Sequence, residues 1–249
     1  MLILFIVIYF SFININVLYS VERIGNYEKN LLFKDFNITS LMKASEEDDA
    51  KAVSILVQSG YNQNDKNVAG VSSLHICAKN NSINALKELL KYSPNINAKD
   101  DEGFTPLMRA CMNDNNEIAK ILIKNNASMW LVNDFNESAL LLASKLDNTE
   151  CCTYILGFSI IKKIKETVNI EQQIQKSLNV AIKKENQNLV DIIDSYKNNK
   201  ENFFNFELVE KYFKNDIDVK ERTVFVLDAK RINQKELKEI SDLIDIIDN

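Results

Sequence analysis

Glycine and proline are scarce in this chain. It has 5 Gly and 2 Pro among 249 residues, too few for an architecture of many tight β-turns, which depend on these two residues. Their scarcity therefore favours helices. The glycines are also scattered singly, so they cannot build the glycine-rich loop that cradles a phosphate group.

Histidine is scarcer still, and this limits the available chemistry. Because His75 is the single histidine, any Ser–His–Asp or Cys–His arrangement would depend on it alone, and a metal site of clustered histidines is excluded. The acidic run at positions 46–49 is predicted to be solvated surface at a helix end. The sequence therefore predicts no enzyme, no metal, no cofactor and no small-molecule substrate.

The chain also lacks an excess of basic residues. Its formal net charge is −5, whereas nucleic-acid binding requires a clustered basic surface. The apolar fraction of 46% and the charged fraction of 26% are those of a folded globular protein. We therefore expect a folded protein that does not bind nucleic acid.

The four cysteines fit no C-x-x-C, zinc or redox spacing. They are Cys77, Cys111, Cys151 and Cys152. All four are predicted to lie inside helices, where a buried thiol acts as a small apolar residue. Free thiols are therefore expected, and disulfides are the alternative for an exported protein.

The first twenty residues have no charged side chain. Their apolar run from Leu2 to Ile13 is typical of the central region of a signal peptide, with cleavage after Ser20. The alternative is an uncleaved membrane anchor, although Asn14 and Asn16 interrupt a span that needs about 20 apolar residues. The segment predicts entry into the secretory pathway, with membrane association only if it is not cleaved.

A leucine followed three places later by a small residue recurs along the chain. The leucines are Leu41, Leu74, Leu107, Leu140 and Leu178. The first four are 33 residues apart, and the fifth follows after 38, which indicates a five-residue insertion. The small residues are Ala44, Cys77, Ala110, Ala143 and Ala181. Such a fixed period predicts a stack of similar units that bury their apolar faces on one another.

The third copy of this motif shows why each unit is predicted to be helical. Thr105 is expected to cap a short helix and Pro106 to occupy its first turn, where no N–H group is needed. Gly70 and Gly103, four places before the leucines, are predicted to have positive φ, as is Asn136 in the next copy. A second helix follows in each copy, marked by an apolar stripe with a spacing near 3.6 residues.

These residues resemble the ankyrin repeat. The best copies are Ser72–Ala78 (SSLHICA) and Gly103–Ala110 (GFTPLMRA), and the family pattern is T-P-L-H-x-A with a period of 33. The resemblance covers about residues 36–196. It implies an all-α solenoid of about five stacked helix–turn–helix pairs, the last one divergent, joined by β-hairpin loops. It also implies that His75 is structural and ties neighbouring loops by hydrogen bonds.

The predicted organisation has four parts. Residues 1–20 are the signal peptide or anchor, 21–35 a linker or cap, and 36–196 the ankyrin repeat domain. Within it, the insertion around residues 157–173 is predicted to lengthen a helix. Residues 197–249 are predicted to form a C-terminal cap, with a small separate helical module as the alternative.

The resemblance also implies where a partner protein binds, because ankyrin proteins commonly use their hairpin tips and the inner face of their short helices. At the matching inner-helix positions the candidates are Glu46, Glu47, Lys79, Met112, Lys145 and Leu146. The charges change from acidic in the first copy to basic in the last, at Lys183 and Lys184. This gradient either orients a charged partner or only keeps the surface soluble.

Two aromatic residues stand in the third hairpin. Trp130 occupies a position where the family usually has asparagine, and Phe135 lies near the tip. Either both join Met112 and Leu146 in an apolar centre for a partner, or Trp130 packs on the adjacent hairpin.

The predicted function is a non-catalytic scaffold that binds a partner protein in the secretory pathway, as a secreted or lumenal protein. The alternative is a membrane-anchored adaptor that docks a larger enzyme or channel through its C-terminal region.

Overall fold

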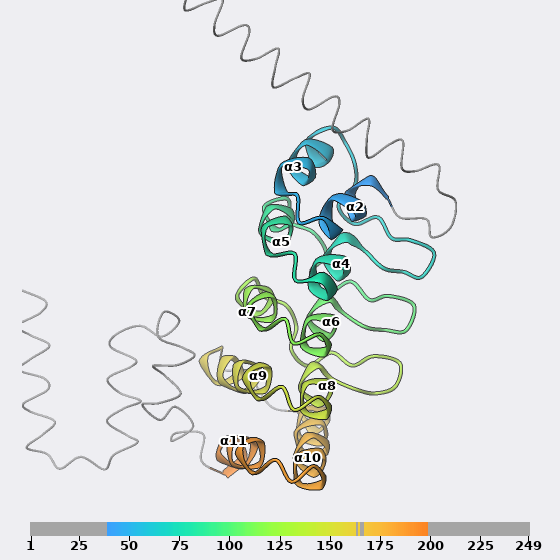
Figure 1. The fold of residues 1–249 in the computed structure, drawn as a ribbon. Coiled ribbons are helices and arrows are strands. Elements are labelled where there is room, and N and C mark those ends of the chain that lie inside the picture. Colours follow the sequence, from blue (N-terminus) through green and yellow to red (C-terminus); the bar gives the residue numbers. More distant parts are fainter. Residues whose placement is uncertain (1–38, 163, 165–166, 199–249) are drawn as a thin grey trace, which may run out of the picture. The chain divides into compact units, whose positions relative to one another are not determined.

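The chain folds into pairs of short helices. The computed structural model describes residues 39–162, 164 and 167–198 (Figure 1). They fall into two compact units, one ending at Leu146 and the other beginning at Asp147. The predictions for residues 1–35 and for 199–249 lie outside the described residues. Across the described ranges, no helix is both long and apolar enough to cross a membrane.

The first unit has two layers of helices (Figure 1). The inner layer consists of α2 (Ser40–Glu46), α4 (Ser73–Asn80), α6 (Pro106–Met112) and α8 (Ala139–Lys145). The outer layer consists of α3 (Ala50–Gln58), α5 (Ile83–Leu90) and α7 (Asn116–Lys124). Each inner helix packs against the next inner helix and, for α2, α4 and α6, against its own outer helix. The core of the unit therefore lies between the layers and continues from repeat to repeat.

The repeated leucines lie in this core, as predicted. Leu41, Leu74, Leu107 and Leu140 are at most 2% exposed. The small residues three places later, among them Ala110, are completely buried. A small side chain lets adjacent helices approach closely, whereas a large one would overpack the contact. The 33-residue period thus places chemically equivalent residues in equivalent packing sites.

Residues with positive φ follow the helices and recur with the same 33-residue period. The turns after the inner helices use Asp48, Asn81 and Asp114, and those after the outer helices use Gly60, Ser93 and Asn126. Asn, Asp and Gly tolerate the left-handed region best. The predicted cap is also present, because Thr105 Oγ1 accepts a hydrogen bond from the Met108 N–H at 3.3 Å and α6 begins at Pro106.

Three long connections project from the inner layer, on the side away from the outer helices (Figure 1). We call them finger 1 (residues 59–72), finger 2 (residues 91–105) and finger 3 (residues 125–138). Each tip is closed by one side chain, since Oδ1 of Asn67, Asp100 or Asn133 accepts hydrogen bonds from the N–H groups two and four residues later. Gly70, Gly103 and Asn136 follow at positive φ, as predicted.

The second unit contains α9 (Thr149–Ile161), α10 (Val168–Lys183) and α11 (Gln187–Asn198). The prediction of a longer helix near the insertion is confirmed, because α9 and α10 span 13 and 16 residues. Only six residues separate α9 from α10, compared with the 14 or 15 of a finger. Leu178 and Ala181 are buried, so the fifth copy of the motif keeps its core positions.

All four cysteines lie in helices, as predicted, but the expectation of four free thiols is wrong. Cys77 and Cys152 are buried and form no disulfide, whereas Cys111 and Cys151 are disulfide-bonded. The spacing of cysteines along the sequence did not indicate this, because disulfide formation depends on distance in space. Burial raises the pKa of the Cys77 thiol to about 12, so this thiol stays protonated and unreactive.

Candidate partner-binding surface

His75 joins finger 1 to finger 2. Its Nδ1 accepts a hydrogen bond from the Ser72 N–H at 3.2 Å, and its Nε2 donates to the Phe104 carbonyl at 3.0 Å. These partners require the neutral ring with its proton on Nε2. The predicted structural role is thus confirmed. Burial lowers the pKa of His75 below its ordinary value of 6.5.

We expect the stability of the protein to fall as the pH drops below about 6.5. The unfolded chain takes up a proton at His75 before the folded chain does, so stability is lost down to the lower, folded pKa and then levels off. The slope cannot exceed about 1.4 kcal/mol per pH unit for one proton. Urea unfolding at several pH values would measure it. His75→Gln keeps an acceptor for the Ser72 N–H, and its free energy of unfolding should change little between about pH 7 and 5.5. Equal slopes of stability against pH in the variant and the original protein would contradict the prediction.

The fingers are braced against one another by main-chain hydrogen bonds. The Asp101 N–H donates to the Ala69 carbonyl at 3.1 Å, and the Asp134 N–H donates to the Glu102 carbonyl at 3.2 Å. Lysine side chains add a second connection, because Lys66 Nζ and Lys99 Nζ donate to main-chain carbonyls 33 residues further on, at 2.8 and 2.7 Å. The fingers therefore form one frame rather than three independent loops.

Phe135 stands on this frame as an exposed aromatic side chain. It is 64% exposed, and its ring contacts the ring of Phe104 in finger 2, with centroids 6.4 Å apart. Phe104 is buried, and the Arg109 guanidinium lies 4.2 Å from the centre of its ring. Arg109 is held by the buried carboxylate of Asp100 and by Glu102. Phe135 thus rests on a supported aromatic ring.

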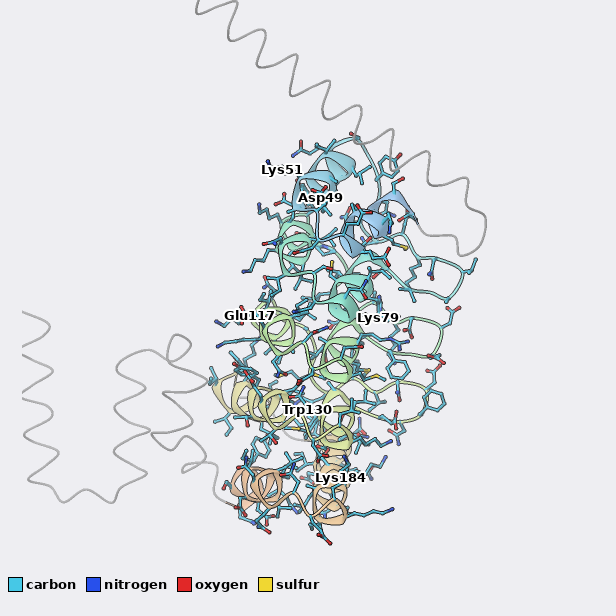
Figure 2. All side chains as sticks on the ribbon, in the orientation of Figure 1. Asp49, Lys51, Lys79, Glu117, Trp130 and Lys184 are labelled. Carbon is cyan, nitrogen blue, oxygen red and sulfur yellow. The ribbon has the colours of Figure 1, made fainter. Side chains whose placement is uncertain are left out.

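Trp130 belongs to the base of finger 3. It is half-buried, and Figure 2 shows it close to the helices. The equivalent residues of the earlier fingers are asparagines: Asn64 Oδ1 accepts from the Asn95 N–H at 2.7 Å, and Asn97 Oδ1 accepts from the Ser128 N–H at 2.8 Å. Tryptophan cannot accept such a bond, so this link between hairpins is not repeated at position 130.

The other candidate residues lie at the C-terminal ends of the inner helices. They are Glu46 and Glu47 on α2, Lys79 on α4, Met112 on α6, and Lys145 and Leu146 at the end of α8. Met112 is half-buried and the others are exposed, with Leu146 at 54%. Lys43 pairs with Glu46 and Glu47, and Lys145 with Glu137. Figure 2 shows Lys79 on the inner layer and Glu117 on the outer layer.

The apolar candidates are therefore divided between two places. Trp130 and Phe135 precede α8, whereas Leu146 follows it, and a helix of seven residues is about 10 Å long. Met112 occupies the position of Lys145 one repeat earlier. The candidates thus form two groups along the inner layer, one on the fingers and one at the helix ends, rather than one compact cluster.

A comparison with protein families agrees with this architecture. The model of ankyrin repeats matches three times, over residues 17–100, 41–133 and 107–203. Together the matches cover most of the chain. The chain belongs to the ankyrin repeat family. No curated protein matches it.

Membership explains the fold and the general role of the surface. The helix pairs of this chain form an all-α ankyrin solenoid, and ankyrin repeats generally mediate protein–protein interaction without catalysis. Among residues 39–162, 164 and 167–198, no three His, Cys, Asp or Glu side chains are grouped so as to hold a metal ion.

Sequence reasoning missed several residues of this ankyrin surface. Val68 at the tip of finger 1 is 72% exposed, and Phe104, Arg109 and Glu102 support Phe135. The 33-residue period could have shown part of this surface, since it places Glu102 and Phe135 at the same position of successive fingers. What the period could not show is that the Phe104 ring turns toward Phe135, because the two residues belong to different repeats.

Proposed function

We propose that this ankyrin repeat protein is a non-catalytic scaffold that binds a partner protein through its fingers and the inner-helix face. The observation that carries the proposal is Phe135, a 64% exposed aromatic ring on a cross-braced frame. Burying an aromatic side chain removes a large apolar area from water, and exposed aromatic residues are common hot spots of protein interfaces. Because neighbouring fingers already hold the ring, little conformational entropy is lost on binding.

The charged side chains around the apolar ones suit a protein partner. Lys79, Glu46 and Glu47 lie exposed at the ends of the inner helices, on the same layer as Leu146. Protein interfaces combine an apolar centre with a polar rim that excludes water and selects the partner. The inner layer offers both kinds of side chain along successive repeats.

Affinity capture from native cells tests this function. We expect the double variant Phe135→Ala/Leu146→Ala to capture at least about tenfold less partner than the original protein, since each truncation removes exposed apolar area at a proposed contact. Quantitative mass spectrometry would measure the amounts. Val168→Ala is the matched control, because Val168 is 70% exposed but lies on α10. Equal capture by all three proteins would contradict the proposal.

We further propose that the scaffold acts in the secretory pathway, secreted or lumenal. The uncharged apolar segment at residues 1–20 supports this, and so do the disulfide-bonded Cys111 and Cys151, because disulfides persist in oxidising compartments. The alternative, a membrane-anchored adaptor that docks a larger enzyme or channel, keeps the segment. N-terminal sequencing of the mature protein and protease protection of a C-terminal tag distinguish them: cleavage near Ser20 with a protected tag supports the first.

A further inference from the structure

Acidic residues occupy the tips of fingers 2 and 3, where Phe135 also lies. Asp101, Glu102 and Asp134 are all exposed, and the side chain of Glu102 is 62% exposed. Asp134 is the residue before Phe135, and its N–H is bonded to the Glu102 carbonyl at 3.2 Å. Acidic residues of two fingers therefore lie near one exposed aromatic residue.

The nearby cations are already directed elsewhere. Arg109 stacks on Phe104 and pairs with two carboxylates, those of the buried Asp100 and, at 3.3 Å, of Glu102. Lys99 Nζ donates to the Val132 carbonyl at 2.7 Å, and Lys145 pairs with Glu137. Each of these cations satisfies a group of the protein itself, and Arg109 alone faces two carboxylates. The tips therefore keep an excess of negative charge, which attracts a cation from outside.

The face of an aromatic ring also favours a cation. The electron-rich face of phenylalanine attracts ammonium and guanidinium groups, and this fold already uses that attraction where Arg109 lies 4.2 Å from the centre of the Phe104 ring. Phe135 offers a second ring of the same kind, open to solvent, on a finger tip that also carries the exposed Asp134. A lysine or arginine side chain of a partner can make both contacts at once.

Glycine at one position of a finger lets the next finger pack closely against it. An aspartate of the next finger packs against each of these glycines: a Cβ on Gly70 would collide with Asp101 Oδ1, and one on Gly103 would lie 2.5 Å from Asp134 Oδ1. Finger 3 has Asn136 at this position, with φ of 57°.

We propose that the tips of fingers 2 and 3 bind a basic, extended segment of the partner protein. A lysine or arginine side chain of that segment stacks on Phe135 and pairs with Asp101, Glu102 or Asp134. This inference rests on the proposed function, since it names the chemistry of the partner at the same fingers.

Titration with synthetic peptides tests the inference. The probes are three fluorescein-labelled ten-residue peptides that alternate Thr with Lys, Gln or Glu, because Thr favours an extended chain. Fluorescence anisotropy reports binding, and Trp130, the single tryptophan, reports on finger 3. At about 50 mM salt we expect the Thr-Lys peptide to bind at least about tenfold more tightly than the other two, and this preference to shrink as salt screens the charges.

Variants of the tips locate the binding. Phe135→Ala should weaken the Thr-Lys peptide about three- to tenfold, and Asp101→Asn/Glu102→Gln by a similar factor. The matched controls lie outside the proposed surface: Val168→Ala, at a side chain that is 70% exposed on α10, and Glu117→Gln/Glu171→Gln, which removes two exposed negative charges from α7 and α10. Both controls should change the affinity less than about twofold, and thermal unfolding would confirm that every variant is folded.

Three results would overturn the inference. The first is that the Thr-Lys peptide does not bind, or that the protein prefers the Thr-Glu peptide. The second is that the tip variants and their controls lose the same amount of affinity. The third is that the protein self-associates in sedimentation experiments and that this depends on Phe135. If Phe135→Ala/Leu146→Ala still abolishes capture of the native partner while the Thr-Lys peptide does not bind, only the inference fails and the proposed function stands.

Discussion

Replacing Leu107 by alanine is expected to lower the free energy of unfolding by about 2–5 kcal/mol. Leu107 is 1% exposed, and α6 packs against α4, α7 and α8. The substitution removes apolar contacts and leaves a cavity that surrounding helices cannot fill, because they are fixed by their own neighbours. Since a repeat is stable only through its neighbours, the loss should spread to adjacent repeats. Urea unfolding followed by circular dichroism and by Trp130 fluorescence would measure it.

Leu146→Ala is the matched control for Leu107→Ala. It is the same chemical change at a side chain that is 54% exposed, and surface substitutions usually change stability by no more than about 0.5 kcal/mol. A loss at Leu107 as small as that at Leu146 would mean that the repeated leucines do not form the core. The alignment of repeats and the fingers derived from it would then both be wrong.

Gly103→Ala is expected to destabilise the protein by about 2–4 kcal/mol, for two separate reasons. Gly103 has φ of 78°, a conformation that strains any residue with a Cβ. The new methyl group would also lie 2.7 Å from the main-chain nitrogen of Asp134. Main chain cannot rotate away as a flexible side chain can, so fingers 2 and 3 must separate. Thermal unfolding would measure the loss.

Gly60→Ala separates the two causes. Gly60 also has a positive φ, of 97°, but nothing lies within 4 Å of an added Cβ. It should therefore show the backbone strain alone, about 1–2 kcal/mol. A Gly103→Ala loss equal to that of Gly60→Ala would show that the fingers are not held at the close approach described above.

The core and the turns could be predicted because each rests on a local rule that the period repeats. Equal spacing was enough to place Leu41, Leu74 and Leu107 in equivalent buried sites. The positive φ of Asn136 could be predicted because it aligns with Gly70 and Gly103. The arrangement around Phe135 was not predictable in this way. It depends on which way the Phe104 ring turns and on where Arg109 finds a carboxylate, and both are decided by packing between repeats. The disulfide-bonded state of Cys111 and Cys151 was missed for the same reason.

The structural role of His75 came from the resemblance to the ankyrin repeat. From the residues alone came the repeat period, the helix pairs and the buried leucines. These follow from contacts that recur every 33 residues, so one copy explains the others. Only the tertiary structure decided that the fingers brace one another, that Phe135 stands exposed against Phe104, and that acidic residues of two fingers lie near it. Such features join side chains from different repeats, and the energies that select them are set by distances in space, which spacing along the chain does not contain.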